Sequence, residues 1–521
     1  MSLLRAAATV SSLTLLSRIT GLARDIIIAR LFGASALTDA FWVAFRIPNL
    51  MRRLFAEGAF SQAFIPILGE VKETSENEQS VRLFIDRVAL VLLSTLTIVT
   101  LIGIVGAPVV VMIMASGLTT EDGQGAYDAA VWMTRLMFPY IICMSLVAFA
   151  SGVLNTYKRF AVPALTPVLL NLCMIAGSLL LQSCFSQPIY ALAVGVMMGG
   201  VAQLSVQWWA LWRLRLRPRL MTPAGPAFKD PVVRRVIRQM APATLGVSVA
   251  QISLLINTNI ATWLTPGSVT WLSFADRLME FPTALIGVAL STVLLPTLSR
   301  ANANKASSQY SDLLDWGMRL VLLLGMPAAL CMILLADAMV ATLFQYGAFD
   351  SHDVAQTQTA VMAYAVGLIG LLMVKILAPG FYGKQDIRTP VKIAIGVLVA
   401  TQLLNIVLVP WLDHAGLALA IGLGACINAC ALFVGLRRRG IYHPSSGWLK
   451  FLARQIVALV TMAISLAWMA DQVHWTDGSL TILHRVGWLA LTLGLGGFVY
   501  LATLTVVGVR LRDFMRKPSV T

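Results

Sequence analysis

The sequence predicts an all-α polytopic membrane protein with fourteen transmembrane helices, and three observations support that prediction. Of the 521 residues, 58% are hydrophobic and only 12% are charged, about half the charged fraction of a typical soluble domain. Apolar runs long enough to cross a bilayer recur along the whole chain. The connections between them alternate between segments rich in Lys and Arg and segments that contain neither. These features exclude an ordinary soluble enzyme, a disordered chain and a coiled coil.

The predicted helices follow from the apolar runs, because a bilayer requires roughly 20 such residues per crossing. In chain order they span 8–32, 38–64, 88–114, 130–154, 162–182, 188–212, 242–264, 272–298, 319–336, 355–378, 391–411, 415–436, 451–470 and 482–508. The first two carry many charges and are the least hydrophobic. The N-terminus does not read as a cleavable signal peptide, because Arg18 interrupts the apolar stretch.

The connections predict the orientation. One set holds most of the Lys and Arg, above all in 213–240 and 437–450. The other set has no Lys or Arg and comprises the turn near Gly33 and segments 115–129, 183–187, 265–271, 337–354, 412–414 and 471–481. Since Lys and Arg collect in cytoplasmic loops, both termini are predicted to be cytoplasmic. The net charge of +15 follows from the same rule, so it does not indicate nucleic-acid binding.

Similar segments about 230 residues apart predict an internal repeat. Segments 154–163 and 379–390 both pass from a helix end through Tyr and basic residues to a Pro that opens the next helix. Asp39 and Asp276 open the second and eighth predicted helices. We expect two six-helix lobes, 1–220 and 230–440, related by a pseudo-two-fold axis along the membrane normal, and two additional helices within 450–508. Paired lobes around a central cavity are typical of transporters.

Charged residues concentrate in the first, second and eighth predicted helices, where they are costly and usually functional. The candidate binding residues are Arg18, Arg24, Arg52 and Arg277. Arginine presents a fixed fork of donors that suits phosphate, so an excess of arginine predicts an anionic, phosphorylated cargo. The candidate cavity or gating acids are Asp39, Glu57, Asp276 and Glu280.

Two alternatives stay open for these charges. Arg53 with Glu57, and Arg277 with Glu280, stand at helical spacing, which also fits pairs that only stabilise the helix. Pro48 should kink the second helix, so periodicity does not decide whether Arg52 or Arg53 faces a cavity.

Residue patterns for catalysis are absent from the sequence. The five histidines fall in or beside predicted loops, and the six cysteines form no CxxC or Cys/His metal spacing. There is no Walker motif and no other glycine-rich phosphate loop. We therefore expect a protein that is not an enzyme and uses no metal and no cofactor.

Long ordered motifs are spread over residues 1–440. Segments 17–25, 38–41 and 46–66 read SRITGLARD, TDAF and RIPNLMRRLFAEGAFSQAFIP, and segments 275–282, 344–347 and 378–382 read ADRLMEFP, FQYG and APGFY. These motifs resemble the MurJ (MviN) family of bacterial lipid II flippases, within the multidrug/oligosaccharidyl-lipid/polysaccharide exporter superfamily. The number of additional C-terminal helices fits as well.

The resemblance implies a function and a location. The cargo would be lipid II, an undecaprenyl diphosphate carrying the peptidoglycan disaccharide-pentapeptide, moved by alternating access from the cytoplasmic to the periplasmic leaflet of the bacterial inner membrane. The family's cavity arginines correspond to Arg18, Arg24, Arg52 and Arg277, and its cavity acids to Asp39 and Glu280. The two additional helices would form a groove for the lipid tail, and other cell-wall synthesis proteins are expected partners.

Other classes predict different observations. A cation-coupled drug exporter, or an exporter of another polysaccharide lipid, would share the fold; the drug exporter should line its cavity with acids and aromatic residues rather than arginines. A membrane-embedded transferase or phosphatase should turn over the lipid when purified.

Overall fold

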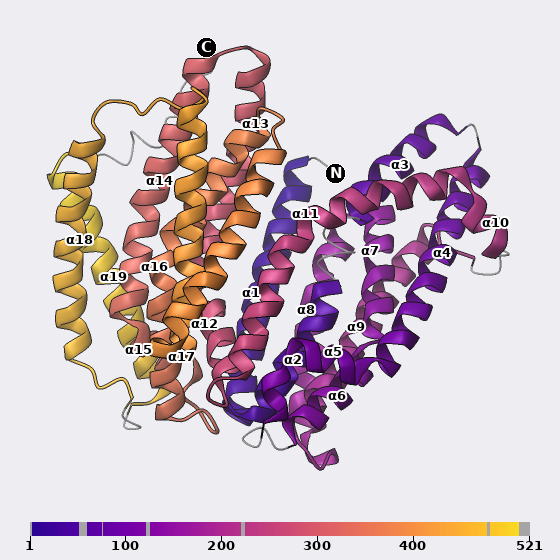
Figure 1. Ribbon diagram of the computed structural model, residues 1–521, viewed down its shortest axis with the longest axis horizontal. Helices are drawn as coiled ribbons and strands as arrows, with labels where there is room; N and C mark the ends of the chain where they lie inside the picture. The colour runs from indigo at the N-terminus through magenta and orange to yellow at the C-terminus, as the bar shows by residue number, and fades with distance from the viewer. Residues whose placement is uncertain are drawn as a thin grey trace. The chain divides into compact units, whose positions relative to one another are not determined.

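The computed structural model describes residues 3–51, 60–75, 77–120, 125–219, 224–476 and 480–509, and every regular element in these ranges is a helix (Figure 1). The all-helical class predicted from composition is confirmed there. By packing, the chain forms two compact units, Met1–Thr270 and Trp271–Thr521.

In the first unit, α1 packs against α8 and α8 against α9. Its apolar core near the α3 end is centred on Phe64, whose ring centroid lies 4.9 Å from that of Phe60 and 5.3 Å from that of Phe149. The elements are α1 (Leu3–Phe32), α2 (Ala36–Met51), α3 (Phe60–Thr74), α4 (Glu78–Val105), α5 (Ala107–Met114), η2 (Ser116–Thr119), α6 (Ala126–Met137), α7 (Tyr140–Thr156), α8 (Ala161–Leu180), η4 (Gln182–Cys184), α9 (Tyr190–Arg213), α10 (Ala224–Lys229) and α11 (Pro231–Thr262).

The second unit begins at Trp271, within α12. In this unit α16 packs against α17. α17 is two helices joined at Asp413, which has φ 51° and ψ −133°. A Cβ on Gly367 would lie 2.1 Å from the Cα of Gly422, so α16 and the second half of α17 require glycine where they meet. The elements are α12 (Ser268–Pro282), the π-helical η5 (Thr283–Val288), α13 (Ala289–Ala303), α14 (Ser307–Leu334), α15 (Ala336–Phe344), α16 (Ser351–Tyr382), α17 (Arg388–Arg438), α18 (Trp448–Asp471) and α19 (Ile482–Val506).

Each predicted transmembrane segment corresponds to one helix, to consecutive helices or to one half of α17. The interruptions fall at residues that break helices: Gly106 between α4 and α5, Pro139 between α6 and α7, and Pro282 before η5. The predicted helix 38–64 corresponds to α2 and α3, and residues 52–59 lie outside the described ranges. Within those ranges, nine helical segments are long and apolar enough to cross a membrane. The fourteen-helix prediction is consistent with this arrangement.

The division by packing differs from the predicted lobe boundary at 220–230. α11 packs in the first unit, where Gly117 N donates to Thr262 Oγ1 (3.2 Å) and Asn259 Nδ2 donates to the carbonyl of Ile113 (3.0 Å). Contacts of α11 with α3 and η2 therefore move the boundary of the compact unit to 270. The symmetric lobes at 1–220 and 230–440, and the separate pair of helices at 450–508, stay predictions about the repeat.

The two segments expected to repeat share an unusual local geometry. Lys158 and Gln385, 227 residues apart, have φ of 59° and 61°. Each is followed by a residue whose N–H reaches five residues back, from Arg159 to Leu154 (2.8 Å) and from Asp386 to Phe381 (3.0 Å). This is a Schellman C-cap, whose left-handed residue is usually glycine. The same non-glycine cap at corresponding places after α7 and α16 supports the internal repeat.

Within each unit, the basic connections contact one another. In the first unit Arg235 pairs with Glu70 (2.9 Å), and Arg87 pairs with Asp230. In the second unit Arg439 pairs with Asp386. The connections without Lys or Arg also meet one another, as in the bond from Trp263 Nε1 to Ser116 Oγ (3.0 Å) and that from Gln345 Nε2 to the carbonyl of Thr476 (3.0 Å). This sorting into two ends fits the predicted alternation of loops.

One buried carboxylate ties α18 to the rest of the second unit. Asp315 on α14 accepts hydrogen bonds from Tyr442 Oη and Trp448 Nε1, both at 2.7 Å, and forms an ion pair with Arg319 (2.8 Å). Ser445 adds a bond from its hydroxyl (2.6 Å). The segment that leads into α18 is thus fixed to α14, beside which α18 and α19 run as a pair (Figure 1).

Candidate functional site

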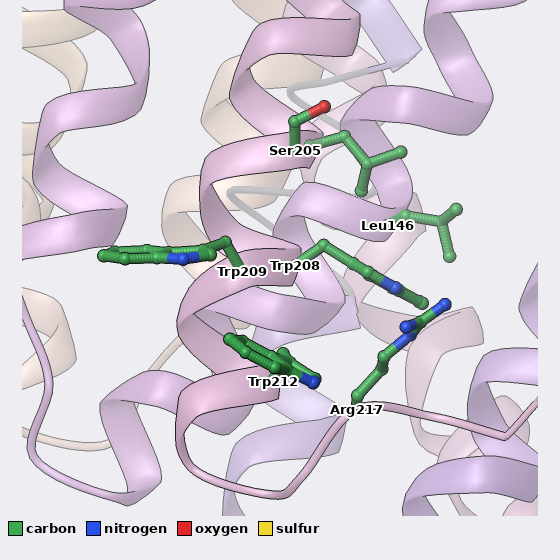
Figure 2. Close-up of a pocket in the computed structure, with 7 residues that line it drawn as sticks. Leu146, Ser205, Trp208, Trp209, Trp212 and Arg217 are labelled. Atoms are coloured by element: carbon green, nitrogen blue, oxygen red, sulfur yellow. The ribbon is translucent and has the colours of Figure 1, made fainter.

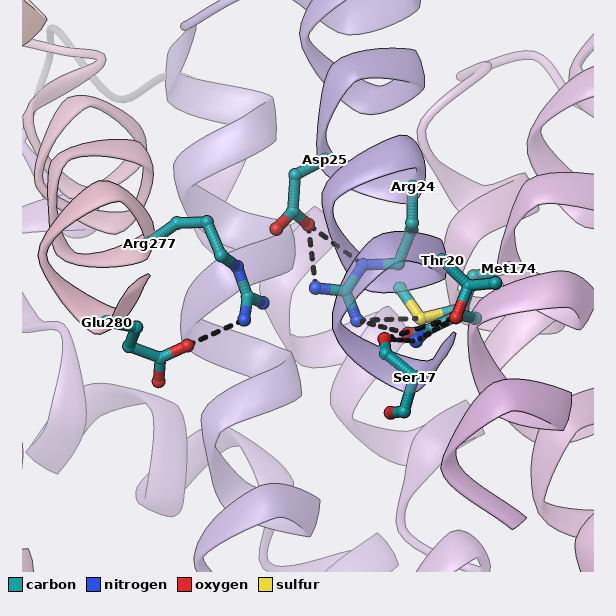
Figure 3. A network of polar contacts seen from close by, with 8 residues as sticks. Ser17, Thr20, Arg24, Asp25, Met174, Arg277 and Glu280 are labelled. Carbon is teal, nitrogen blue, oxygen red and sulfur yellow. Dashed lines mark hydrogen bonds and ion pairs between the residues drawn. The ribbon is translucent and has the colours of Figure 1, made fainter. Parts of the chain in front are cut away.

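Arg24 is the most thoroughly buried of the predicted binding residues that the structure describes, with 5% of its surface exposed. Its Nε and Nη2 donate to one oxygen of Asp25, at 2.8 and 2.6 Å (Figure 3). Its Nη1 donates to Asn171 Oδ1 on α8, at 3.0 Å. The guanidinium is therefore neutralised by a neighbour on its own helix and oriented by a second helix.

Asn171 holds this arrangement together. Its Nδ2 donates to the carbonyl of Ser17 (3.0 Å) and to Thr20 Oγ1 (3.1 Å), both on α1. The amide thus fixes the distance between α1 and α8 while its oxygen receives Arg24. Gly21 does not bend α1, which runs unbroken through it, and a Cβ there would meet Asn171 at 3.4 Å.

Asp25 and Asn171 were not among the predicted site residues. A signal was available for Asn171, because an amide inside an otherwise apolar run such as 162–182 requires partners in the membrane. For Asp25 the sequence was misleading, since adjacent residues point to different sides of a helix. The length of the arginine side chain overcomes that separation.

Arg18, the other predicted binding residue of the first helix, is half-buried. Its side chain forms no hydrogen bond or ion pair with any described residue. Two arginines against the one carboxylate of Asp25 leave an excess of one positive charge on this part of α1. Such an excess suits an anion rather than a cation.

The second unit contains a similar pair. Arg277 Nη1 lies 2.7 Å from Glu280 Oε2, one turn along α12, and the two side chains are 29% and 40% exposed (Figure 3). Asp276 is exposed. The helix changes to the π-helical η5 directly after Pro282, as expected where proline removes a backbone donor.

The structure gives Asp39 a definite structural contact. It is 3% exposed, and its two oxygens accept bonds from Gly267 N (2.7 Å), Thr270 N (2.8 Å) and Thr270 Oγ1 (2.6 Å). Asp39 therefore caps the first turn of α12 from the start of α2. The capping role of Asp39 is observed, whereas its role as a cavity acid stays a prediction.

The remaining predicted residues of this region, Arg52, Arg53 and Glu57, lie outside the described residues. Arg46, which the sequence left without a role, is half-buried and donates to Thr258 Oγ1 on α11. Pro48 lies within α2, which continues to Met51. Among the described residues there is no group of His, Cys, Asp and Glu that could hold a metal ion.

Comparison with known proteins finds matches along nearly the whole chain. The sequence model of the family described as "Lipid II flippase MurJ" matches residues 28–485. A lipid II flippase MurJ from Burkholderia cenocepacia is 52% identical over 517 residues, which cover 99% of this chain and all of that protein. A probable lipid II flippase MurJ from Haemophilus influenzae is 39% identical and covers 97% of this chain.

Solved structures show the same fold. A lipid II flippase MurJ in an inward closed conformation matches with a TM-score of 0.79 at 22% identity, over 97% of this chain and 99% of that one. An inward-facing multidrug resistance MATE transporter of the MOP superfamily matches with a TM-score of 0.65 at 16% identity, over 83% of this chain and 98% of that one. With the family match spanning most of the sequence and close relatives covered end to end, the chain belongs to the MurJ family.

Proposed function

We propose that this chain is a lipid II flippase. It moves the undecaprenyl-diphosphate-linked disaccharide-pentapeptide from the cytoplasmic to the periplasmic leaflet of the inner membrane, for cell-wall synthesis. The observation that carries the proposal is the 52% identity to a lipid II flippase MurJ over essentially the whole length of both proteins. The protein acts as a transporter and not as an enzyme.

The buried arginine explains how such a cargo is held. A guanidinium buried without a counter-charge is costly, so an empty site needs an internal acid. Asp25 supplies that charge to Arg24, and Glu280 supplies it to Arg277. A diphosphate offers the same charge and more oxygen acceptors, so it competes with these acids for the arginine forks. Exchange between two similar partners permits release on the other side.

We assign the diphosphate contacts to Arg18, Arg24, Arg52 and Arg277. The acids Asp39, Glu57, Asp276 and Glu280 are proposed to accompany them in the cavity or in gating. The sugars and the peptide need a hydrated cavity, whereas the isoprenoid tail remains in lipid. The groove for that tail is assigned to α18, which Asp315 ties to α14, and to α19, which packs beside α18.

The chain is a multi-pass membrane protein, and we propose an orientation with both termini in the cytoplasm. The sorting of basic connections to one end of each unit supports it, because Lys and Arg remain on the cytoplasmic side. Other cell-wall synthesis proteins are proposed as partners, since the translocated precursor must be consumed at the outer face.

A cation-coupled drug exporter is the second candidate, and the MATE structures share its fold. An arginine-containing site argues against it, since a cationic drug would meet repulsion at Arg18 and Arg24. Binding of cationic dyes to the purified protein would favour the drug exporter.

The decisive experiment depletes the protein in cells whose only flippase is this chain. Lipid II should then accumulate in the cytoplasmic leaflet, where an externally added lipid-II-cleaving toxin does not reach it. Expressing the wild-type chain again should make lipid II accessible to the toxin. A control variant at an exposed position, Arg30→Ala, should restore this accessibility equally. If lipid II stays accessible during depletion, the proposal is wrong. Chemical turnover of the lipid by the purified protein would instead indicate a transferase or phosphatase.

A further inference from the structure

A pocket of about 580 Å³ lies at the end of α9, and none of the arginines discussed above lines it (Figure 2). Three indole rings and one guanidinium define it, those of Trp208, Trp209, Trp212 and Arg217. Trp209 and Trp212 are 50% and 59% exposed. Trp208 is half-buried and packs on the apolar core of the first unit. One side of the pocket is thus exposed, and its other side is formed by a tryptophan that packs on the core.

The position of these indoles indicates the membrane surface. α9 is apolar enough to span a bilayer, and its last turns lead into the basic connection 213–219. Tryptophan is enriched at the level of lipid headgroups, because its ring is apolar and its N–H is polar. Further along the helix, Met198 and Val201 are exposed and apolar, which offers a path for acyl chains below the pocket.

The charge of the pocket is positive. The Arg213 guanidinium lies 4.0 Å from the ring centroid of Trp209, and Arg217 lines the pocket itself. No carboxylate in the described ranges forms an ion pair with either arginine. The acids of the neighbouring connections are engaged elsewhere, since Asp86 accepts the backbone N–H of Arg219 (2.8 Å) and Asp230 pairs with Arg87. The pocket therefore contains one unneutralised guanidinium, that of Arg217, and has a second one, that of Arg213, stacked on one of its indoles.

The backbone holds Arg217 in place. Arg215 ends α9 in the left-handed conformation (φ 57°), and Leu216 N donates to the carbonyl of Leu211 (2.9 Å). Leu216 and Pro218 are buried while Arg217 is exposed, so the side chains alternate inward and outward. A site fixed in this way loses little conformational entropy when a ligand binds.

We propose that this pocket binds the headgroup phosphate of an anionic glycerophospholipid from the leaflet at the basic end of the protein. Arg217 and Arg213 receive the phosphate, and the indoles contact the glycerol and the first acyl carbons. Basic pockets beside membrane helices bind anionic lipid headgroups by the same combination of charge and interfacial contact. The site goes beyond the proposed transport function and shares no residue with the proposed cargo contacts.

The test measures lipid affinity of the purified full-length chain by native mass spectrometry, with phosphatidylglycerol and phosphatidylcholine as probes. The wild type should prefer phosphatidylglycerol, and the double variant Arg213→Gln/Arg217→Gln should lose about tenfold or more of that affinity, as expected for two surface charges. The matched control Arg159→Gln/Arg234→Gln removes the same charge from two exposed positions of the same unit. It should keep the preference.

Three outcomes overturn the proposal. The first is equal loss in the control, which would indicate a diffuse charge effect. The second is equal binding of phosphatidylcholine by the wild type. The third is displacement of phosphatidylglycerol from the wild type by undecaprenyl phosphate at lower concentration, which would assign the pocket to the polyprenyl cargo. If the double variant is less stable than the wild type, Trp212→Leu provides a second variant that keeps both charges. It should weaken phosphatidylglycerol binding as well.

Discussion

Tyr500 on α19 donates a hydrogen bond of 2.7 Å to the carbonyl oxygen of Leu323 on α14. That carbonyl lacks its usual helical partner, because Pro327 stands four residues later and has no N–H. Gln455 on α18 donates to the preceding carbonyl, that of Leu322 (2.9 Å), and to the Tyr500 hydroxyl (2.7 Å). A proline in α14 thereby frees the carbonyl that receives Tyr500 of α19, and Gln455 of α18 bonds both to the residue before it and to Tyr500.

Tyr500→Phe should destabilise the protein by about 1–2 kcal/mol, because a buried carbonyl is left unsatisfied. Thermal unfolding in detergent measures the effect, with Phe498→Leu, 70% exposed on the same helix, as a neutral control. In a Pro327→Ala background the restored N–H should bond to Leu323, and Tyr500→Phe should then cost much less. An equal cost in both backgrounds would contradict this account.

Lys305→Gly should raise the stability by about 1 kcal/mol. Lys305 has φ 54° and completes a Schellman cap in which Ala306 N donates to the carbonyl of Ala301 (3.0 Å). A side chain in this conformation is strained, and glycine is not. Lys305→Ala removes the same charge but keeps the Cβ, so it should give no such gain. A gain of equal size from alanine would assign the effect to charge.

Arg24→Ala should abolish flipping, and Arg24→Lys should restore it only in part, since lysine has the charge without the fork. A lost charge-assisted phosphate bond costs about 1.5–3 kcal/mol, roughly 10- to 150-fold in lipid II affinity. Because Arg24→Ala leaves Asp25 without this partner, the double variant Arg24→Ala/Asp25→Asn tests binding with both charges removed. Normal growth on that double variant as the only copy would show that the arginine is structural. Arg52→Ala and Arg277→Ala should behave as Arg24→Ala does.

The proposed orientation can be tested with a native thiol. Cys184 is exposed in η4, within a connection that has no Lys or Arg. A membrane-impermeant maleimide should label it in cells whose outer membrane has been permeabilised. In a Cys184→Ser background, a cysteine introduced at the exposed Lys229 should react only after the inner membrane is opened. The reverse pattern would invert the topology.

Asp386 should stabilise the folded protein at neutral pH and lose this effect in acid. Hydrogen bonds from the side chain and backbone of Thr389, together with the ion pair with Arg439, lower the pKa of Asp386 from 3.8 to about 2. A lowered pKa in the folded state stabilises the protein above the unfolded value and stops doing so as the pH falls through the folded value. The difference in melting temperature between wild type and Asp386→Asn should therefore be constant from pH 5 to 8 and shrink between about pH 4 and 2. A difference that changes near neutral pH would contradict this assignment.

Hydropathy and loop charge by themselves determined the helical membrane class, the approximate position of the spans and the sorting of loops into two kinds. These properties depend on the transfer of each segment from water to lipid, which is a sum over local residues. The repeat was also visible, and the caps at Lys158 and Gln385 agree with it. The arginines of α1 and α12 were found for the same reason, since a charge in an apolar run stands out wherever the helix packs.

The partners of those charges depended on tertiary structure. Asn171 reaches Arg24 across 147 positions of sequence, and Asp39 caps α12 across 228, so no local pattern indicates either contact. The boundary of the first compact unit, at 270, depends on tertiary structure in a similar way, because α11 packs on α3 and η2. Hydrophobic periodicity shows that a helix is buried, but the choice of neighbour follows from shape, from glycine contacts such as Gly367 with Gly422, and from polar groups like the Leu323 carbonyl that must find a donor within the membrane.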